Sequence, residues 1–293
     1  MLHPFADNYA DADDQPLVRR ALDGDRPALD ALIRRHQPFL YNVAWKMVHD
    51  PDDALDLTQE TLLKVITKLA QFNFRSSFRT WLYRIVVNEF LQAKRRGREQ
   101  RFDSFDAYAA QLDRLGNPDL TREEEIVQSE LSEEMRLRFM SGMLLCLTRE
   151  QRLIYILGEV FGVDHRSGGE VFECSPQNFR VKLHRARRDL HQFMHQKCGL
   201  VNRDNPCRCP KKTKALREKG LLDHDKREFN RGYRRQIADF VTATHEEARD
   251  HLDDLYTRLY RTHPVRETFD RQMLFDELLS DDQLRQHFRI NDA

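Results

Sequence analysis

Along most of the chain the apolar residues recur at three- and four-residue steps, with polar residues between them. This spacing is that of amphipathic helices, so the sequence predicts an all-α protein. Three helices are expected within residues 15–97. Pro27 can open the first, Asp50 can cap the second with Pro51 in its first position, and the third begins at Phe78 after a turn.

The rest of the chain divides into three parts by composition. Residues 98–120 are polar and are expected to form a linker, and residues 121–196 form a second helical block. Residues 197–293 are expected to form a helical C-terminal extension, which opens with a loop rich in Cys, Lys and Pro. Apolar spacing predicts a long amphipathic helix over 229–261 and a shorter one over 269–279. The sequence thus predicts two helical domains followed by the extension.

The second block contains the pattern of a helix-turn-helix. Thr148 and Gln151 form a capping box, a turn follows at Gly162, and Ser175 and Pro176 supply the N-cap and the first-turn proline of the last helix. This last helix has a seam of four apolar residues, Phe179, Leu183, Ala186 and Leu190. Its other faces are basic and polar, which is the form of a DNA-recognition helix. The alternative interpretation is that this segment is an ordinary surface helix with a charged outer face.

The net charge does not favour a nucleic-acid partner, because 48 Lys and Arg balance 48 Asp and Glu. The charge is unevenly distributed, however. Basic residues form three blocks, which are Lys94, Arg95, Arg96, Arg98 and Arg101; Arg180, Lys182, Arg185, Arg187 and Arg188; and Lys211, Lys212, Lys214, Arg217 and Lys219. Local potential steers a polyanion, so the neutral total is a weak objection, although a basic run is often only a solvated face.

The sequence predicts a cytoplasmic protein. Residues 1–16 are acidic and lack the basic-then-apolar pattern of an export signal. No run of about 18 apolar residues is present, so no membrane span is expected.

Residues 50–96 carry a long motif in two parts. The first part has the form D-A-x-D-x-x-Q-E-x-x-x-K and the second the form F-R-x-W-L-x-R-I-x-x-N. This motif resembles region 2 of the extracytoplasmic-function sigma factors, and the helix-turn-helix resembles their region 4. The resemblance covers residues 15–195. It implies region 2 over 15–97, a short linker in place of region 3, region 4 over 121–196, and a promoter-recognition subunit without catalysis of its own.

The resemblance also implies partners and site residues. Core RNA polymerase, through its clamp and flap, and promoter DNA are the expected partners, and an anti-sigma factor or other regulator is a further candidate. Core polymerase would be bound by Asp52, Asp56, Gln59 and Glu60. Strand opening needs aromatic surface and cations, and the −10 element would be contacted by Phe72, Phe74, Arg75, Arg79, Trp81, Asn88, Lys94 and Arg95. The −35 element would be contacted by Ser175, Gln177, Asn178, Arg180, Val181, His184, Arg185 and Arg188.

Simpler roles compete with some of these assignments. The acidic residues can be an ordinary exposed helix face, Trp81 can be a core residue, and for Phe78 a core position is favoured. The first helix of the region 4 motif departs from the family at Gly168 and Gly169. Each glycine weakens a helix by roughly 1 kcal/mol, which puts the packing of that helix in question.

The extension carries three of the five cysteines and resembles a cysteine-bearing extension of some family members. His195 and Cys198 can share a helix face, and with Cys207 and Cys209 they could bind a structural zinc ion. A thiol redox switch and reduced cysteines without a ligand are the alternatives. No cofactor is required for the expected function, and the extension is expected to inhibit or modulate it.

Two other functions are alternatives to that of a sigma factor. A helix-turn-helix repressor or activator would bind duplex DNA alone, but it needs no aromatic melting segment. A metalloenzyme built on the His and Cys residues would need a carboxylate pair nearby, which the sequence lacks. The region 2 motif therefore favours the sigma factor.

Overall fold

The computed structural model describes residues 3–6, 9–93, 104–199, 201–202 and 204–221. These residues are helical, as the sequence predicts, and none of their helices is long and apolar enough to cross a membrane. The helices are η1 (Asp11–Asp13), α1 (Asp14–Leu22), α2 (Arg26–Val48), α3 (Pro51–Lys68), η2 (Leu69–Gln71), α4 (Phe78–Gln92), α5 (Phe105–Arg114), α6 (Arg122–Leu145), α7 (Arg149–Tyr155), η4 (Ile156–Val160), α8 (His165–Val171), α9 (Pro176–Lys197) and α10 (Cys209–Glu218). The two amphipathic segments predicted at 229–261 and 269–279 lie outside the described residues.

The first four α-helices form an N-terminal bundle, and side-chain caps fix the starts of three of them. Asp25 caps α2, Asp50 caps α3 and Ser77 caps α4, and each side chain accepts a backbone N–H of the first turn. Such caps satisfy donors that have no partner inside a helix. The predicted starts at Asp50-Pro51 and Phe78 are therefore confirmed.

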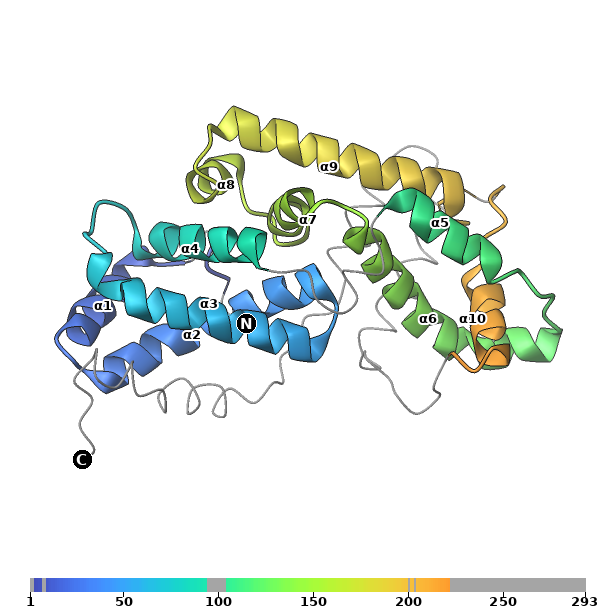
Figure 1. Ribbon diagram of the computed structural model, residues 1–293, viewed down its shortest axis with the longest axis horizontal. Helices are drawn as coiled ribbons and strands as arrows, with labels where there is room; N and C mark the ends of the chain where they lie inside the picture. The colour runs from blue at the N-terminus through green and yellow to red at the C-terminus, as the bar shows by residue number, and fades with distance from the viewer. Residues whose placement is uncertain (1–2, 7–8, 94–103, 200, 203, 222–293) are drawn as a thin grey trace.

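The second half of the described chain contains α5 to α10. In Figure 1, α9 runs from α8 to α5, and α6 lies beside α5 and α10. The polar segment 98–120, expected as a linker, contains the ten-residue helix α5, with Tyr108 and Leu112 buried. Ser104 caps this helix. The four-residue step between these two apolar residues is a helical signal that the polar composition of the segment obscures.

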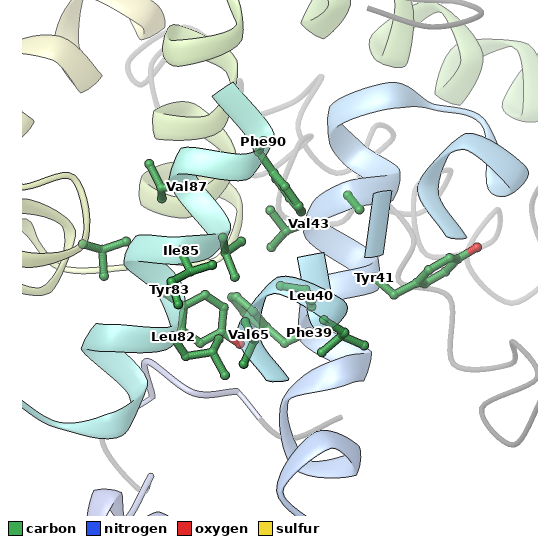
Figure 2. Packing of buried hydrophobic residues seen from close by; sticks show 14 of the residues in the cluster. Phe39, Leu40, Tyr41, Val43, Val65, Leu82, Tyr83, Ile85, Val87 and Phe90 are labelled. Atoms are coloured by element: carbon green, nitrogen blue, oxygen red, sulfur yellow. The ribbon is translucent and has the colours of Figure 1, made fainter. Parts of the chain in front are cut away.

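The N-terminal bundle and the helix-turn-helix share one hydrophobic core. Figure 2 shows α4 residues such as Tyr83 and Phe90 beside α2 residues such as Phe39 and Val43. The same cluster includes side chains from the second half, namely Leu153, Ile156, Leu157, Val163 and Val171. The two halves are thus packed together rather than held only by the intervening segment.

Two arginines of α7 form hydrogen bonds that join the helix-turn-helix to the N-terminal bundle. Arg149 donates to the carbonyls of Phe90 and Ala93 at the end of α4. Arg152 is fully buried and donates to the carbonyl of Met47, near the end of α2, at 2.5 Å. The last carbonyls of a helix lack partners within it and carry the negative end of its dipole, so a guanidinium stabilises them.

Candidate nucleic-acid interface

The helix-turn-helix consists of α7 with its continuation η4, then α8, then α9. The capping box at Thr148 is present, because its side chain accepts the N–H of Gln151 and the Gln151 side chain accepts the N–H of Thr148. Asp164 caps α8, and Ser175 caps α9 by accepting the N–H of Asn178 at 3.1 Å. The helix starts predicted at Thr148 and Ser175 are therefore confirmed, and Asp164 supplies a third cap between them.

The faces of α9 divide as expected for a recognition helix. The predicted seam is buried, at Phe179, Leu183, Ala186 and Leu190. The predicted contact residues are all exposed, at Ser175, Gln177, Asn178, Arg180, Val181, His184, Arg185 and Arg188. Phe179 and Leu183 pack against Ile154 of α7, and Ala186 and Leu190 belong to the cluster that includes α5 and α6 residues. In Figure 1, α9 lies along the outer edge of the described structure.

The two glycines of α8 are required by close packing. A Cβ atom at Gly168 would lie 2.5 Å from the ring of Phe179, and one at Gly169 would lie 2.8 Å from the carbonyl oxygen of Cys174. The departure from the family pattern at these positions therefore lets α8 approach α9 more closely. Their low helix propensity is offset by this contact.

We expect Gly168→Ala to lower the free energy of unfolding by about 1–3 kcal/mol, because overpacking outweighs the gain in helix propensity. Urea denaturation measures the change. The control is Arg166→Ala, an exposed position in the same helix, which should change stability by less than about 0.5 kcal/mol. A stabilised Gly168→Ala variant would contradict the packing argument.

Two cations of the second basic block pair with acids on other helices. Arg187 pairs with the buried carboxylate of Glu159 on η4, and Lys182 donates to Glu150 at 2.6 Å. The sequence shows both cations in the block but not their partners, which lie 28 and 32 residues away. The exposed cations of the block are Arg180, Arg185 and Arg188, and Arg188 also pairs with the adjacent Asp189 at 2.9 Å.

The aromatic residues before and within α4 form one cluster. The ring of Phe72 lies 4.7 Å from that of Phe74 and 5.4 Å from that of Trp81, between centroids. Phe72 and Phe78 are buried, whereas Phe74 and Trp81 are half-buried. The favoured core position of Phe78 is confirmed. Phe72 is predicted to offer a surface to a base, but in this conformation its ring is buried, whereas the rings of Phe74 and Trp81 are partly accessible.

The polar residues predicted for the −10 element have different surroundings. Arg75 and Asn88 are exposed. Arg79 is largely covered, because it donates to the carbonyl of Pro4 at 2.6 Å and pairs with Asp11 at 3.1 Å. Lys94 and Arg95 lie outside the described residues. The structure therefore brings part of the predicted surface together and covers one of its cations with the N-terminus.

The acidic residues of α3 lie on its outer side. Asp52, Asp56 and Glu60 are exposed at four-residue steps and Gln59 is half-buried, while Leu57 and Thr58 face the core. Residues four apart are neighbours on a helix surface, so the three carboxylates form one stripe. A stripe of this kind suits a basic partner.

The comparisons with known proteins agree with this geometry. The Sigma-70 region 2 family matches residues 32–100. The ECF RNA polymerase sigma-E factor of Escherichia coli K12 is 30% identical over 179 residues, which are 59% of this chain and 90% of that protein. The chain belongs to the extracytoplasmic-function sigma factors.

Two other RNA polymerase sigma factors are similar over much of the chain. SigE of Mycolicibacterium smegmatis is 28% identical over 66% of this chain and 74% of its own length. The RNA polymerase sigma-H factor of Pseudomonas aeruginosa is 27% identical over 62% of this chain and 93% of its own length. Within this sigma factor, the match to region 2 begins in α2 and includes all of α3 and α4.

Helix α10 packs on α5, on the segment after it and on α6. Lys212 of α10 is buried and donates to the carbonyl of Leu112 at 2.5 Å and to that of Gly116 at 2.8 Å, at and just beyond the end of α5. Lys211 and Lys214 pair with Asp119 and Glu124. These lysines of the third basic block are thus held by contacts within the chain, a role that the sequence alone does not reveal.

The predicted zinc ligands are only partly brought together. Cys198 and Cys207 are joined by a backbone bridge, and Cys209 begins α10, whereas the His195 side chain is exposed. Burial raises the pKa of Cys207 and of Cys209 to about 11, and a neighbouring thiol adds to each rise. In the part of the chain that the structure describes, no group of three or more His, Cys, Asp or Glu residues is placed to hold a metal ion. The zinc site stays a prediction.

Proposed function

We infer that this chain binds core RNA polymerase and directs promoter recognition, strand opening and transcription initiation. The observation that carries the proposal is the combination of an exposed recognition helix with the region 2 fold, in a chain of the sigma factor family. The chemistry of RNA synthesis then belongs to the core enzyme, and this chain supplies promoter specificity.

The proposal assigns the −35 element to α9. A recognition helix reads base edges with residues near its N-terminus, while cations further along hold phosphates. Gln177 and Asn178 stand in the first turn of α9, and Arg185 stands about two turns later. All three side chains are exposed, which supports this division of roles.

We expect two kinds of substitution in α9 to act differently on binding of the holoenzyme to duplex −35 DNA. Arg185→Ala should weaken binding to all sequences alike and reduce the salt slope by about 1, because one phosphate contact is lost. Gln177→Ala should change which base is preferred and leave the salt slope unchanged. Binding titrations over a range of salt, on sets of single-base variants, measure both. Equal effects of the two substitutions on base preference would contradict the assignment.

The proposal assigns the −10 element to α4 and the segment before it. Phe74 and Trp81 are the half-buried rings on which an unpaired base can stack, and Arg75, the residue after Phe74, is an exposed cation. The Arg19 guanidinium lies over the Phe74 ring at 4.6 Å from its centroid. Base stacking on aromatic side chains contributes about 1–3 kcal/mol per base. The stripe of Asp52, Asp56 and Glu60 on α3 is proposed to bind a basic surface of the polymerase clamp.

Permanganate footprinting tests the proposal for strand opening, because the reagent oxidises unpaired thymines. Core polymerase is incubated with promoter DNA, with and without this chain. We expect reactive thymines near the −10 element only when the chain is present, and we expect Trp81→Ala to reduce their reactivity about tenfold. A chain that binds core polymerase and promoter but leaves every thymine protected would contradict the assignment of melting to this surface.

A further inference from the structure

Residues 3–6 and 9–14, here called the N-terminal segment, are packed on the protein rather than solvated. The Phe5 ring lies 5.0 Å from that of Tyr83 on α4, between centroids, and Phe5 belongs to the shared core. At the end of the segment, Asp14 is fully buried and accepts a hydrogen bond from Arg35 at 2.8 Å. The segment is thus anchored at both ends of its described part.

Between these anchors the segment encloses the guanidinium of Arg79, near the start of α4. The nitrogens of Arg79 donate to the carbonyl of Pro4 at 2.6 Å and pair with Asp11 at 3.1 Å. The aromatic rings of Phe5 and Tyr9 lie 5.4 and 5.5 Å from the guanidinium carbon. Only 19% of the Arg79 side chain is exposed. A nucleic-acid phosphate would need the donors that Pro4 and Asp11 now occupy.

The same segment also contacts the helix-turn-helix. The Nε2–H of His3 donates to the carbonyl of Phe161, just after η4, at 2.7 Å, and the His3 ring lies 5.0 Å from that of Phe39 on α2. Nearby, Arg84 of α4 donates to the carbonyl of Glu170 on α8 at 2.8 Å. The segment therefore lies where the region 2 and region 4 domains meet, and α8 covers the adjoining part of α4.

We propose that the N-terminal segment is an autoinhibitory element, which occupies Arg79 in the free protein and is displaced when the opened −10 strand binds. The inference rests on the proposed function for the identity of the strand, but the contact itself is independent of polymerase. If DNA binds only when the segment is displaced, the apparent dissociation constant equals the intrinsic one divided by the fraction of protein in which the segment is displaced. Loosening the segment should therefore tighten binding of single-stranded DNA by the free protein.

The test uses the full chain and a fluorescent single-stranded A+T-rich oligonucleotide, with affinity measured by anisotropy. The variant His3→Ala/Asp11→Asn removes one contact to the helix-turn-helix and one to Arg79. We expect it to bind the oligonucleotide about five- to tenfold more tightly than the wild type. Asp23→Asn, which removes the same charge at an exposed site, should change affinity less than twofold.

A third substitution tests whether the gain in DNA affinity comes from release of Arg79 or only from the change in net charge. Adding Arg79→Gln to the double variant should abolish the gain, because the released cation is then absent. Thermal unfolding verifies that each variant is folded, and a deletion of residues 1–10 provides a second way to remove the contacts. Unchanged affinity in the double variant and in the deletion, or a gain that persists without Arg79, would overturn the proposal. Because no polymerase is present, neither result depends on the outcome of transcription assays.

Discussion

Replacing Arg152 with alanine is expected to lower the free energy of unfolding by about 3–5 kcal/mol. The guanidinium is fully buried and donates to the carbonyls of Met47, Leu144, Leu145 and Leu147, at 2.5 to 3.1 Å. Alanine leaves these carbonyls without that donor in a site that water does not reach. Hydrogen bonds to a charged group contribute about 1.5–3 kcal/mol each, and relief from burying the charge offsets part of the loss. Urea denaturation followed by circular dichroism measures the change.

The matched control for this prediction is Arg26→Ala. Arg26 is exposed at the first position of α2, where a cation is not favoured by the helix dipole, so its removal should change stability by less than about 0.5 kcal/mol. Arg152→Lys should lower the free energy of unfolding by an amount between those of Arg152→Ala and Arg26→Ala, because a single ammonium cannot reach all four carbonyls. If Arg152→Ala lowers the free energy of unfolding by less than about 1 kcal/mol, the contact between Arg152 and Met47 does not hold the two halves together.

Reversing two charges on α3, in the variant Asp56→Lys/Glu60→Lys, is expected to weaken binding of core polymerase by about 100-fold. Both carboxylates are exposed one turn apart on α3, and thermal unfolding verifies that the variant is folded. If the stripe meets a basic surface of the clamp, the reversal places like charges opposite each other, which costs several kcal/mol. Titration of labelled chain with core polymerase measures the affinity.

The control for this reversal is Asp23→Lys/Glu218→Lys, which makes the same change of net charge at exposed positions away from the stripe. We expect this control to reduce the affinity less than threefold. Equal losses in the two variants would mean that net charge rather than the α3 stripe governs binding. An unaltered affinity in the first variant would remove the stripe from the polymerase interface.

The features that the sequence predicted best are local ones. The caps at Asp50, Thr148 and Ser175 depend on residues within one helical turn, and all three are present. The seam of α9 follows from helical periodicity, and it is buried as predicted. The identity of the exposed face follows from the same periodicity, so its predicted DNA contacts are all accessible.

The features that the sequence did not predict depend on which segments meet in space. The α5 helix was interpreted as linker, because polar residues surround Tyr108 and Leu112. The contacts of Arg152 with Met47 join positions 105 residues apart, and no local pattern indicates such a pair. The same holds for Arg79, whose chemistry predicts a DNA contact but whose coverage by the N-terminal segment requires the fold. Tertiary contacts therefore modify the predicted site without altering the recognition helix.

The most direct test of the central claim is run-off transcription with purified bacterial core RNA polymerase, on a template that carries the promoter upstream of this protein's own gene. The assay compares core enzyme alone with core enzyme plus the full chain. We predict a discrete transcript that depends on the added chain and that decreases when Arg185 is replaced by alanine. Failure of the chain to bind core polymerase, with no transcript at any concentration, would contradict the assignment of this chain as a promoter-specificity subunit.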